Sequence, residues 1–229
     1  MGDPIRSKPT TFIASLSSKQ LPAVVSQSHL NYFVKPDELK ESLAYSKWLT
    51  EPIPNQNQST LDPAYEEVQK QKHASQHENA QRALAAITAL ENSSSADRTR
   101  INIQRCIEEF GRHNTDAILP PKPASKVISN VTAKKEDSSQ IETVPKQRAG
   151  PDTGSSEVQA AILTAKINVL ADNLYKKDKH NKRALRLLVH KRQKMLSYLR
   201  RKERGGPRWQ NLVEKLGIGD AMWKGEISL

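Results

Sequence analysis

The chain has 229 residues with a formal net charge of +11, 36% hydrophobic side chains, 5% aromatic side chains and nine glycines. So few rings and glycines argue against a β-sandwich or β-barrel, which needs many tight turns and packed aromatic residues. The single cysteine, Cys106, excludes an internal disulfide and a cysteine-based zinc site, and no apolar run approaches the roughly 18 residues needed to cross a membrane.

Residues 1–96 are expected to form an N-terminal extension that is only partly helical. The first 35 residues show no sustained periodicity and predict an extended or irregular chain. Pro36 opens a predicted helix that ends at Trp48. A longer helix is predicted to begin at Pro63 and to end in the Ala-rich run at 82–90.

Residues 97–112 predict another helix, with Ile101, Cys106 and Phe110 on its apolar side. Residues 113–149 are rich in proline near their start and contain a long polar run after it. This composition is typical of a linker or a surface insertion.

Residues 150–218 predict three helices followed by a tail at 219–229. Ser156 and Gln159 have the spacing of a capping box, which predicts a helix start. After a polar turn, a second long helix is predicted to run to about Arg204. Because two long helices joined by a short turn pack antiparallel, we predict an all-α helical bundle built on a long antiparallel hairpin.

The positive charge is concentrated in this C-terminal part. Residues 145–229 contain nineteen Lys and Arg against eight Asp and Glu, whereas 1–144 are neutral. The run from Lys176 to Arg204 holds thirteen basic residues and two acids. Such a field attracts a polyanion, most simply a folded RNA. The alternative is a solvated surface that only maintains solubility, and the scarcity of acids favours RNA.

The second long helix predicts two faces. Leu185, Leu188, Met195, Leu196 and Leu199 are expected to face the partner helix, and the candidate RNA-binding side chains on another side are Lys191, Lys194, Tyr198, Arg201 and Lys202. Tyr198 can stack on a base or ribose while its neighbours hold phosphates. In the preceding loop, Asp178 and Asn181 have two interpretations: they cap the helix, or they contact base edges and ribose hydroxyls.

No catalytic residue, metal site or cofactor is predicted. The P-loop, dinucleotide-binding and nucleophile-elbow motifs are absent from the sequence. His73 and His77 have the spacing of two metal ligands, but no third ligand follows them. A nuclease based on His180 or His190 lacks a second catalytic group, apart from Asp178. We therefore do not expect an enzyme.

Several runs of the sequence resemble a known family. DTGSSEVQAAILTAKINVLADNL, KKDKHNKRALRLLVHKRQKMLSYLRRK and RWQNLVEKLGI resemble small-subunit ribosomal protein S15 over residues 150–218. IEEFGR at 107–112 is similar to the short first helix of that family, which makes 113–149 an insertion before the DTGS turn. The resemblance implies a helical bundle that binds the central domain of small-subunit rRNA at a junction of helices, early in assembly.

The resemblance also implies where the rRNA contacts lie: in the DTGS turn and the Gln after it, in the loop before the second long helix, and on that helix. With the basic residues around them, the candidate rRNA-binding set is Thr153, Gly154, Gln159, Lys177, Asp178, His180, Asn181, Arg183, Lys191, Lys194, Tyr198, Arg201 and Lys202. This loop departs from the family, which commonly has Ser in place of Asn181 and His in place of Asn173.

A long neutral extension and an insertion are what a mitochondrial form of the family would add. We therefore expect a mitochondrial ribosomal protein whose partners are small-subunit rRNA, neighbouring small-subunit proteins and, at the intersubunit face, the other subunit. The extension is expected to contact proteins, so that deleting residues 1–90 leaves the affinity for rRNA nearly unchanged. The alternative is a free RNA-binding regulator that uses the same basic face.

Overall fold

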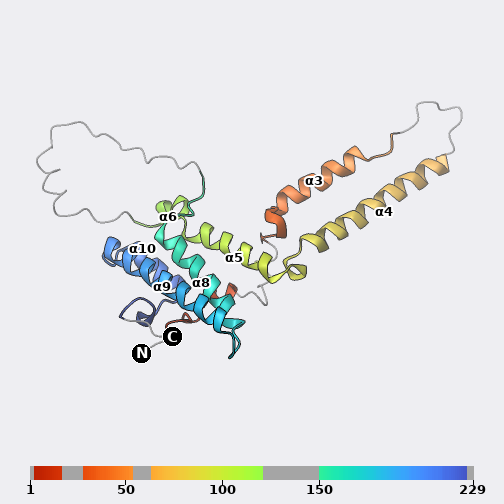
Figure 1. The fold of residues 1–229 in the computed structure, drawn as a ribbon. Helices are drawn as coiled ribbons and strands as arrows, with labels where there is room; N and C mark the ends of the chain where they lie inside the picture. Colours follow the sequence, from red (N-terminus) through yellow and green to blue (C-terminus); the bar gives the residue numbers. More distant parts are fainter. Residues whose placement is uncertain (1–2, 17–27, 54–62, 121–149, 226–229) are drawn as a thin grey trace, which may run out of the picture. The chain divides into compact units, whose positions relative to one another are not determined.

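The structure is a computed structural model that describes residues 3–16, 28–53, 63–120 and 150–225 (Figure 1). Every regular element in these ranges is a helix, which confirms the predicted all-α class. The chain forms two units: unit 1 contains 1–17 and 102–229, and unit 2 contains 18–101. In the described part of the chain, no helix is both long enough and apolar enough to cross a membrane.

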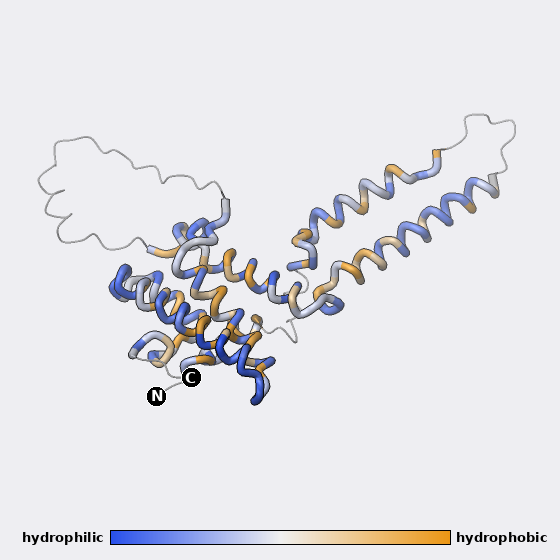
Figure 2. The backbone as a smooth tube through the Cα atoms, viewed as in Figure 1, coloured by the Kyte–Doolittle hydropathy of each residue, from blue (hydrophilic) through white to orange (hydrophobic). Residues whose placement is uncertain are grey.

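Unit 1 is built on the predicted helix hairpin. Its two arms are α8 (Ser156–Asp172) and α9 (Lys179–Glu203), which lie side by side in Figure 1. In Figure 2, apolar residues are concentrated in α8, whereas hydrophilic residues dominate α9. The hairpin therefore offers one side to a core and leaves a strongly polar side on α9.

The start of α8 differs from the prediction by one residue. Ser155 is the capping residue, and its Oγ accepts the N–H of Val158 at 3.5 Å. Ser156 is buried instead, and its Oγ donates to the Glu157 carboxylate at 3.1 Å. Either of two successive serines fits the local capping pattern, and the hydrogen bond of Ser156 to Glu157 leaves Ser155 as the cap. The predicted capping box, formed by Ser156 and Gln159, is therefore wrong.

Two further helices, and part of a third that begins in unit 2, accompany the hairpin in unit 1. α10 (Pro207–Leu216) has proline in its first turn and ends at Gly217, whose φ of 58° is left-handed. α5 spans Ser95–Phe110, two residues earlier than predicted, and α6 (Arg112–Ile118) occupies the first residues of the predicted insertion. Residues 121–149 of that insertion lie outside the described residues.

The hydrophobic core of unit 1 joins α5, α8, α9 and α10. Its fully buried members include Cys106, Phe110, Val158, Ala161, Leu196, Leu199, Leu212 and Leu216. Burying one large apolar side chain contributes about 1.5–3 kcal/mol, so this cluster is the main source of stability for the hairpin. Burial raises the pKa of the Cys106 thiol to about 12. Cys106 is therefore a protonated packing group at neutral pH.

The N-terminal segment also belongs to this core. α1 (Thr11–Ser15) presents Phe12 and Ile13 to the main cluster, and Leu16 is 1% exposed within it. Phe12 meets Phe110 edge to face, with ring centroids 5.4 Å apart. This apolar burial shows that residues 3–16 are part of unit 1, although they show no helical periodicity in the sequence.

Polar contacts hold the same segment at both ends. The Lys8 N–H donates to the Gly217 carbonyl at 2.9 Å, and Thr10 Oγ1 donates to the Lys215 carbonyl at 2.7 Å. The Asn102 side-chain amide donates to the Leu16 carbonyl at 3.0 Å. Removing residues 1–90 would therefore open the core, so the predicted harmless deletion is not a clean test of RNA binding.

Arg192 on α9 is fully buried beneath the N-terminal segment. Its Nη2 donates to the carbonyl oxygens of Pro4 and Ile5, at 2.7 and 3.1 Å. Burial lowers the pKa of Arg192 to about 10, and Asp3 opposes that shift. One of the thirteen cations in the basic run is thus a structural group and is not available to bind RNA.

Unit 2 contains the predicted helices of the extension. α3 spans Pro36–Leu49 and α4 spans Pro63–Thr88. The hydroxyl of Thr50 and His73 Nε2 lie 2.9 Å apart. The apolar side of α3 is only partly covered: Leu39 and Leu43 are half-buried, whereas Trp48 is 67% exposed.

Candidate nucleic-acid interface

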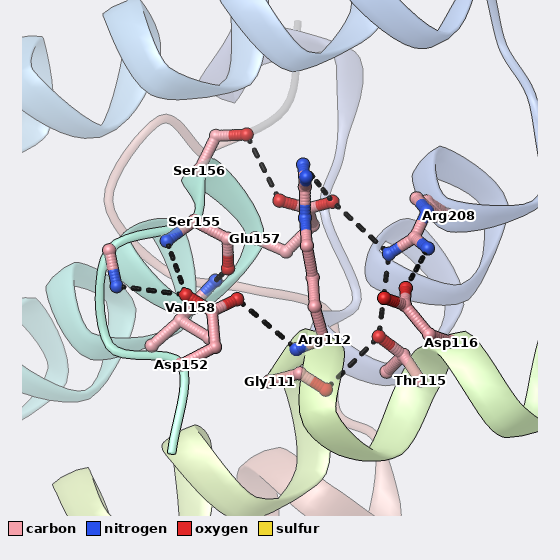
Figure 3. A network of polar contacts seen from close by, with 11 residues as sticks. Gly111, Arg112, Thr115, Asp116, Asp152, Ser155, Ser156, Glu157, Val158 and Arg208 are labelled. Atoms are coloured by element: carbon pink, nitrogen blue, oxygen red, sulfur yellow. Dashed lines mark hydrogen bonds and ion pairs between the residues drawn. The ribbon is translucent and has the colours of Figure 1, made fainter. Parts of the chain in front are cut away.

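The turn that precedes α8 is held by Asp152. Its Oδ1 accepts the backbone N–H groups of Gly154 and Ser155, each at 3.2 Å, and its Oδ2 accepts the N–H of Arg112 at 3.1 Å (Figure 3). Burial acts to raise the pKa of Asp152, but these hydrogen bonds outweigh it and hold the pKa below the ordinary value. The charged carboxylate therefore fixes the turn.

An ion-pair network supports this turn from α6 and α10. The guanidinium groups of Arg112 and Arg208 both approach the Glu157 carboxylate (Figure 3), at 3.5 and 3.9 Å. Arg208 also pairs with Asp116, and Thr115 Oγ1 donates to the Gly111 carbonyl at 3.1 Å. Because Glu157 is buried, its two cationic partners are needed to offset the cost of removing its charge from water.

The predicted contacts of this turn lie together on the surface. Thr153 and Gly154 are exposed, and the side-chain amide of Gln159 donates to the Thr153 carbonyl at 2.6 Å. No atom lies within 4 Å of a Cβ built on Gly154, so its outer side is open. The arrangement presents a short, rigid stretch of backbone that could approach a nucleic acid closely.

The loop before α9 shows the capping interpretation directly. The Asp178 carboxylate accepts the N–H of Asn181 at 3.0 Å and also the side-chain amide of Asn181. Lys177, His180 and Arg183 are exposed around this cap. Asp178 and Asn181 thus shape the loop, and a contact of either side chain with RNA stays a prediction.

The predicted stripe on α9 is exposed along its whole length. Its members are Lys191, Lys194, Tyr198, Arg201 and Lys202. Tyr198 is 49% exposed, and the Lys202 ammonium lies 5.7 Å from the centroid of its ring. On the opposite side of α9, Leu185, Val189, Leu196 and Leu199 are buried. Core packing therefore orients an aromatic ring and four cations toward solvent.

The hairpin separates the candidates into two groups. The turn at 153–159 and the end of the stripe at 198–202 belong to the same end of the antiparallel pair. The loop at 177–183 lies at the other end. Twenty residues of helix rise about 30 Å, which is the distance between the Tyr198 and Asp178 regions along α9. One folded RNA would have to meet both groups across that length.

Sequence reasoning missed one exposed cation near the first group. Lys166 on α8 is exposed and stands seven residues after Gln159, which places it on the same stripe two turns later. The spacing of seven residues between Gln159 and Lys166 was the sequence signal that could have identified this cation. Within the described ranges there is no cluster of three His, Cys, Asp or Glu side chains able to hold a metal ion.

Sequence comparison relates the helices that carry these residues to a known family. Residues 138–219 match the sequence model of the family described as Ribosomal protein S15. This range contains α8, α9 and α10 but not residues 107–112. The structure nevertheless places Arg112 and His113 beside Asp152, since the Asp152 N–H donates to His113 Nδ1 at 3.2 Å.

Two relatives show how far the similarity extends. Small ribosomal subunit protein uS15m of Neurospora crassa is 39% identical over 254 residues, which cover 100% of this chain and 75% of that protein. Small ribosomal subunit protein uS15 of Halorhodospira halophila is 46% identical over 74 residues, or 31% of this chain and 81% of that protein. Because one relative is 39% identical over the whole of this chain, the chain belongs to the ribosomal protein S15 family of the small ribosomal subunit.

Proposed function

We propose that this protein is a non-catalytic structural component of the mitochondrial small ribosomal subunit that binds the central domain of its rRNA at a helix junction. The observation that carries the proposal is the exposed stripe of Tyr198 and four cations, held outward on α9 by a packed core. A ribosomal protein of this family would use such a stripe to bind folded RNA.

The interface divides into positioning and recognising groups. Lys191, Lys194, Arg201 and Lys202 supply charge for phosphates, which fixes the protein on the RNA without reading sequence. The ring of Tyr198 can stack on an unpaired base, which a helix junction offers and a regular duplex does not. The backbone at 153–154 is held rigidly enough to fit one RNA shape. Together these groups favour a junction over a plain duplex.

Unit 2 is proposed to contact neighbouring ribosomal proteins. It contains nine Lys and Arg against ten Asp and Glu, so it offers no excess charge to phosphates. Its exposed side chains include the paired rings of Tyr45 and Trp48, 5.8 Å apart, and Ile53 at 88% exposure. Exposed aromatic groups on a surface without excess positive charge are typical of protein interfaces.

The relative that matches the entire chain supports the mitochondrial assignment. That relative carries the name uS15m and matches 100% of this chain, unit 2 included, whereas the relative named uS15 matches 31% of it. Cofractionation of the tagged protein with mitochondrial small subunits tests the assignment. A protein that stays free of ribosomes while binding RNA would instead be a regulator.

The RNA-binding part is tested with the full chain, because residues 3–16 complete the core. Binding to a three-way junction from the central domain is compared with binding to a plain duplex of equal length, over a series of salt concentrations. Each neutralised phosphate contributes a slope of about 0.9 in log affinity against log salt. A preference for the junction that survives physiological salt supports the proposal. Equal and salt-sensitive binding to both RNAs contradicts it.

A further inference from the structure

A second basic cluster lies at the end of α9, next to the stripe, with which it shares Arg201. The C-terminal tail folds back there: Gln193 Nε2 donates to the Gly225 carbonyl at 2.6 Å and Ser197 Oγ donates to the Trp223 carbonyl at 3.3 Å. Trp223 meets Trp209 edge to face at 5.6 Å. These contacts fix the described part of the tail against one flank of the helix.

The tail and the end of α9 border an open surface pocket of about 420 Å³. It is lined by Ser197, Arg200, Arg201, Arg204, Trp223, Lys224 and Gly225. The lining contains four cations and no carboxylate. Within the described residues, none of the three arginines forms an ion pair, whereas Lys224 pairs with the exposed Asp220 at 3.2 Å. The described residues therefore leave three of the four cations of this pocket without an ion-pair partner.

The positions of the arginines are set by the fold. The Arg200 guanidinium stacks over the Trp223 ring at 4.0 Å, which orients its N–H groups along the ring plane. Arg204 has a left-handed backbone with φ 51°, at the residue where α9 ends. The helix dipole places a partial negative charge at this end of α9, which disfavours an anion. One of the carbonyl groups there is already hydrogen-bonded, since the Arg204 N–H donates to the Arg200 carbonyl at 2.8 Å. The three positive guanidinium groups outweigh the partial negative charge of the dipole.

We propose that this pocket binds a backbone phosphate of the same RNA that occupies the stripe. The inference rests on the proposed RNA-binding function. Arg201 belongs both to the stripe and to the pocket lining, so one strand can pass from the Tyr198 side to the pocket. Trp223, Lys224 and Gly225 lie beyond residue 219, where the family match ends. The tail thus contributes three of the lining residues from outside the family match, and the end of α9 contributes the other four from inside it.

The test compares two double variants of the full chain in the junction-binding assay. Arg200→Gln with Arg204→Asn removes two pocket charges and keeps a residue that tolerates the left-handed backbone at 204. Lys70→Gln with Arg82→Gln removes two charges from unit 2 as the control. Lys224→Gln, at an exposed position, is a third variant that leaves the helix untouched. Circular dichroism checks that all of them fold.

We expect the pocket variant to bind the junction about 10-fold more weakly than the control, with a salt slope lower by about 1. Equal affinity and slope in both double variants, with the wild-type preference for the junction retained, would overturn the pocket but leave the proposed function standing. A wild-type protein without any preference for the junction would overturn the function itself, and with it this inference.

Two further outcomes separate the sources of the anion. Calorimetric titration with inorganic phosphate is expected to show only weak binding; micromolar binding that the pocket variant loses would mean a free phosphate ligand and overturn the RNA assignment. The pocket variant could instead bind RNA normally but no longer cofractionate with the small subunit. That result would identify an acidic protein segment as the ligand of the pocket and would also overturn the RNA assignment.

Discussion

Lys8 and Gly217 are joined backbone to backbone: the Lys8 N–H donates to the Gly217 carbonyl at 2.9 Å. Gly217 has a left-handed φ of 58°, and a Cβ built on it would lie 2.3 Å from the Lys8 carbonyl oxygen. Position 217 therefore requires glycine for two independent reasons. The left-handed conformation that ends α10 disfavours other residues, and the N-terminal segment approaches too closely to leave room for a side chain.

Gly217→Ala is expected to destabilise unit 1 by about 1–3 kcal/mol, since it combines left-handed strain with a backbone clash. Thermal unfolding measures the loss. Gly205→Ala, at φ 77° with no atom near its Cβ, reports the strain alone, and Gly219→Ala, at φ −88° in open space, serves as the control. A Gly217 variant no less stable than the Gly205 variant would show that the approach of Lys8 costs nothing.

Asp152→Asn should weaken the turn at 153–154, because the new amide cannot accept the N–H of Arg112. The loss is about 1 kcal/mol for a partly exposed hydrogen bond to a charge. Since the pKa of Asp152 is depressed in the folded state, its contribution is present above the unfolded value near 3.8 and is lost as the pH falls through the lower folded value. The stability gap between variant and wild type should therefore close in acid. A gap independent of pH would contradict this role.

Tyr198→Ala is expected to cost about 1–3 kcal/mol of RNA-binding free energy if the ring stacks on a base, with little change in salt slope. Tyr198→Phe keeps the ring and should bind nearly as well. Arg201→Ala or Lys202→Ala should instead flatten the slope by about 1. Tyr45→Ala in unit 2 removes an equally exposed ring as the control. Unchanged binding in all the α9 variants would move the site off this face.

Arg192→Met removes the donor that holds the Pro4 and Ile5 carbonyls, while its buried apolar stem is largely kept. Because a buried cation without a full set of partners is costly, global stability should change little. The N-terminal segment should open more often, so the Lys8 amide should exchange about 5- to 30-fold faster. Arg186→Met on the exposed side of α9 is the control. Unchanged exchange at Lys8 would mean that apolar packing alone holds the segment.

Unit 2 can be tested by excision. Leu16 and Asn102 are joined at 3.0 Å, so a short Gly-Ser linker can replace residues 18–101 without moving the segment that completes the core. RNA affinity should stay within about twofold of the wild type, the limit for independent sites. A folded excision variant with much weaker binding would show that unit 2 touches the RNA.

The helices were predictable where the signals are local. Prolines at Pro36, Pro63 and Pro207 and the glycine at Gly217 mark ends that the structure places within a residue or two. The burial of Phe12 and Leu16 was not predictable, because their partners lie far away in the sequence and the segment has no period of its own. Long-range packing overrides a weak local pattern.

The candidate site shows the same division. The spacing of Tyr198, Arg201 and Lys202 predicted a shared exposed face, because core leucines orient the helix. Composition could not reveal that Arg192 in the same run is buried. Nor could it show that the tail carries Trp223 onto Arg200, since that contact joins two segments with no common pattern.

The contact between Lys8 and Gly217 also sets an order of events during synthesis. About 200 residues separate the two, which at 5–20 residues per second corresponds to about 10–40 s. Through that interval the hydrogen bond between Lys8 and Gly217 cannot form, although Phe110, the ring partner of Phe12, is synthesised well before Gly217. Such long-range contacts raise the contact order of the fold, so we expect the Lys8 segment to dock only after α10 has formed.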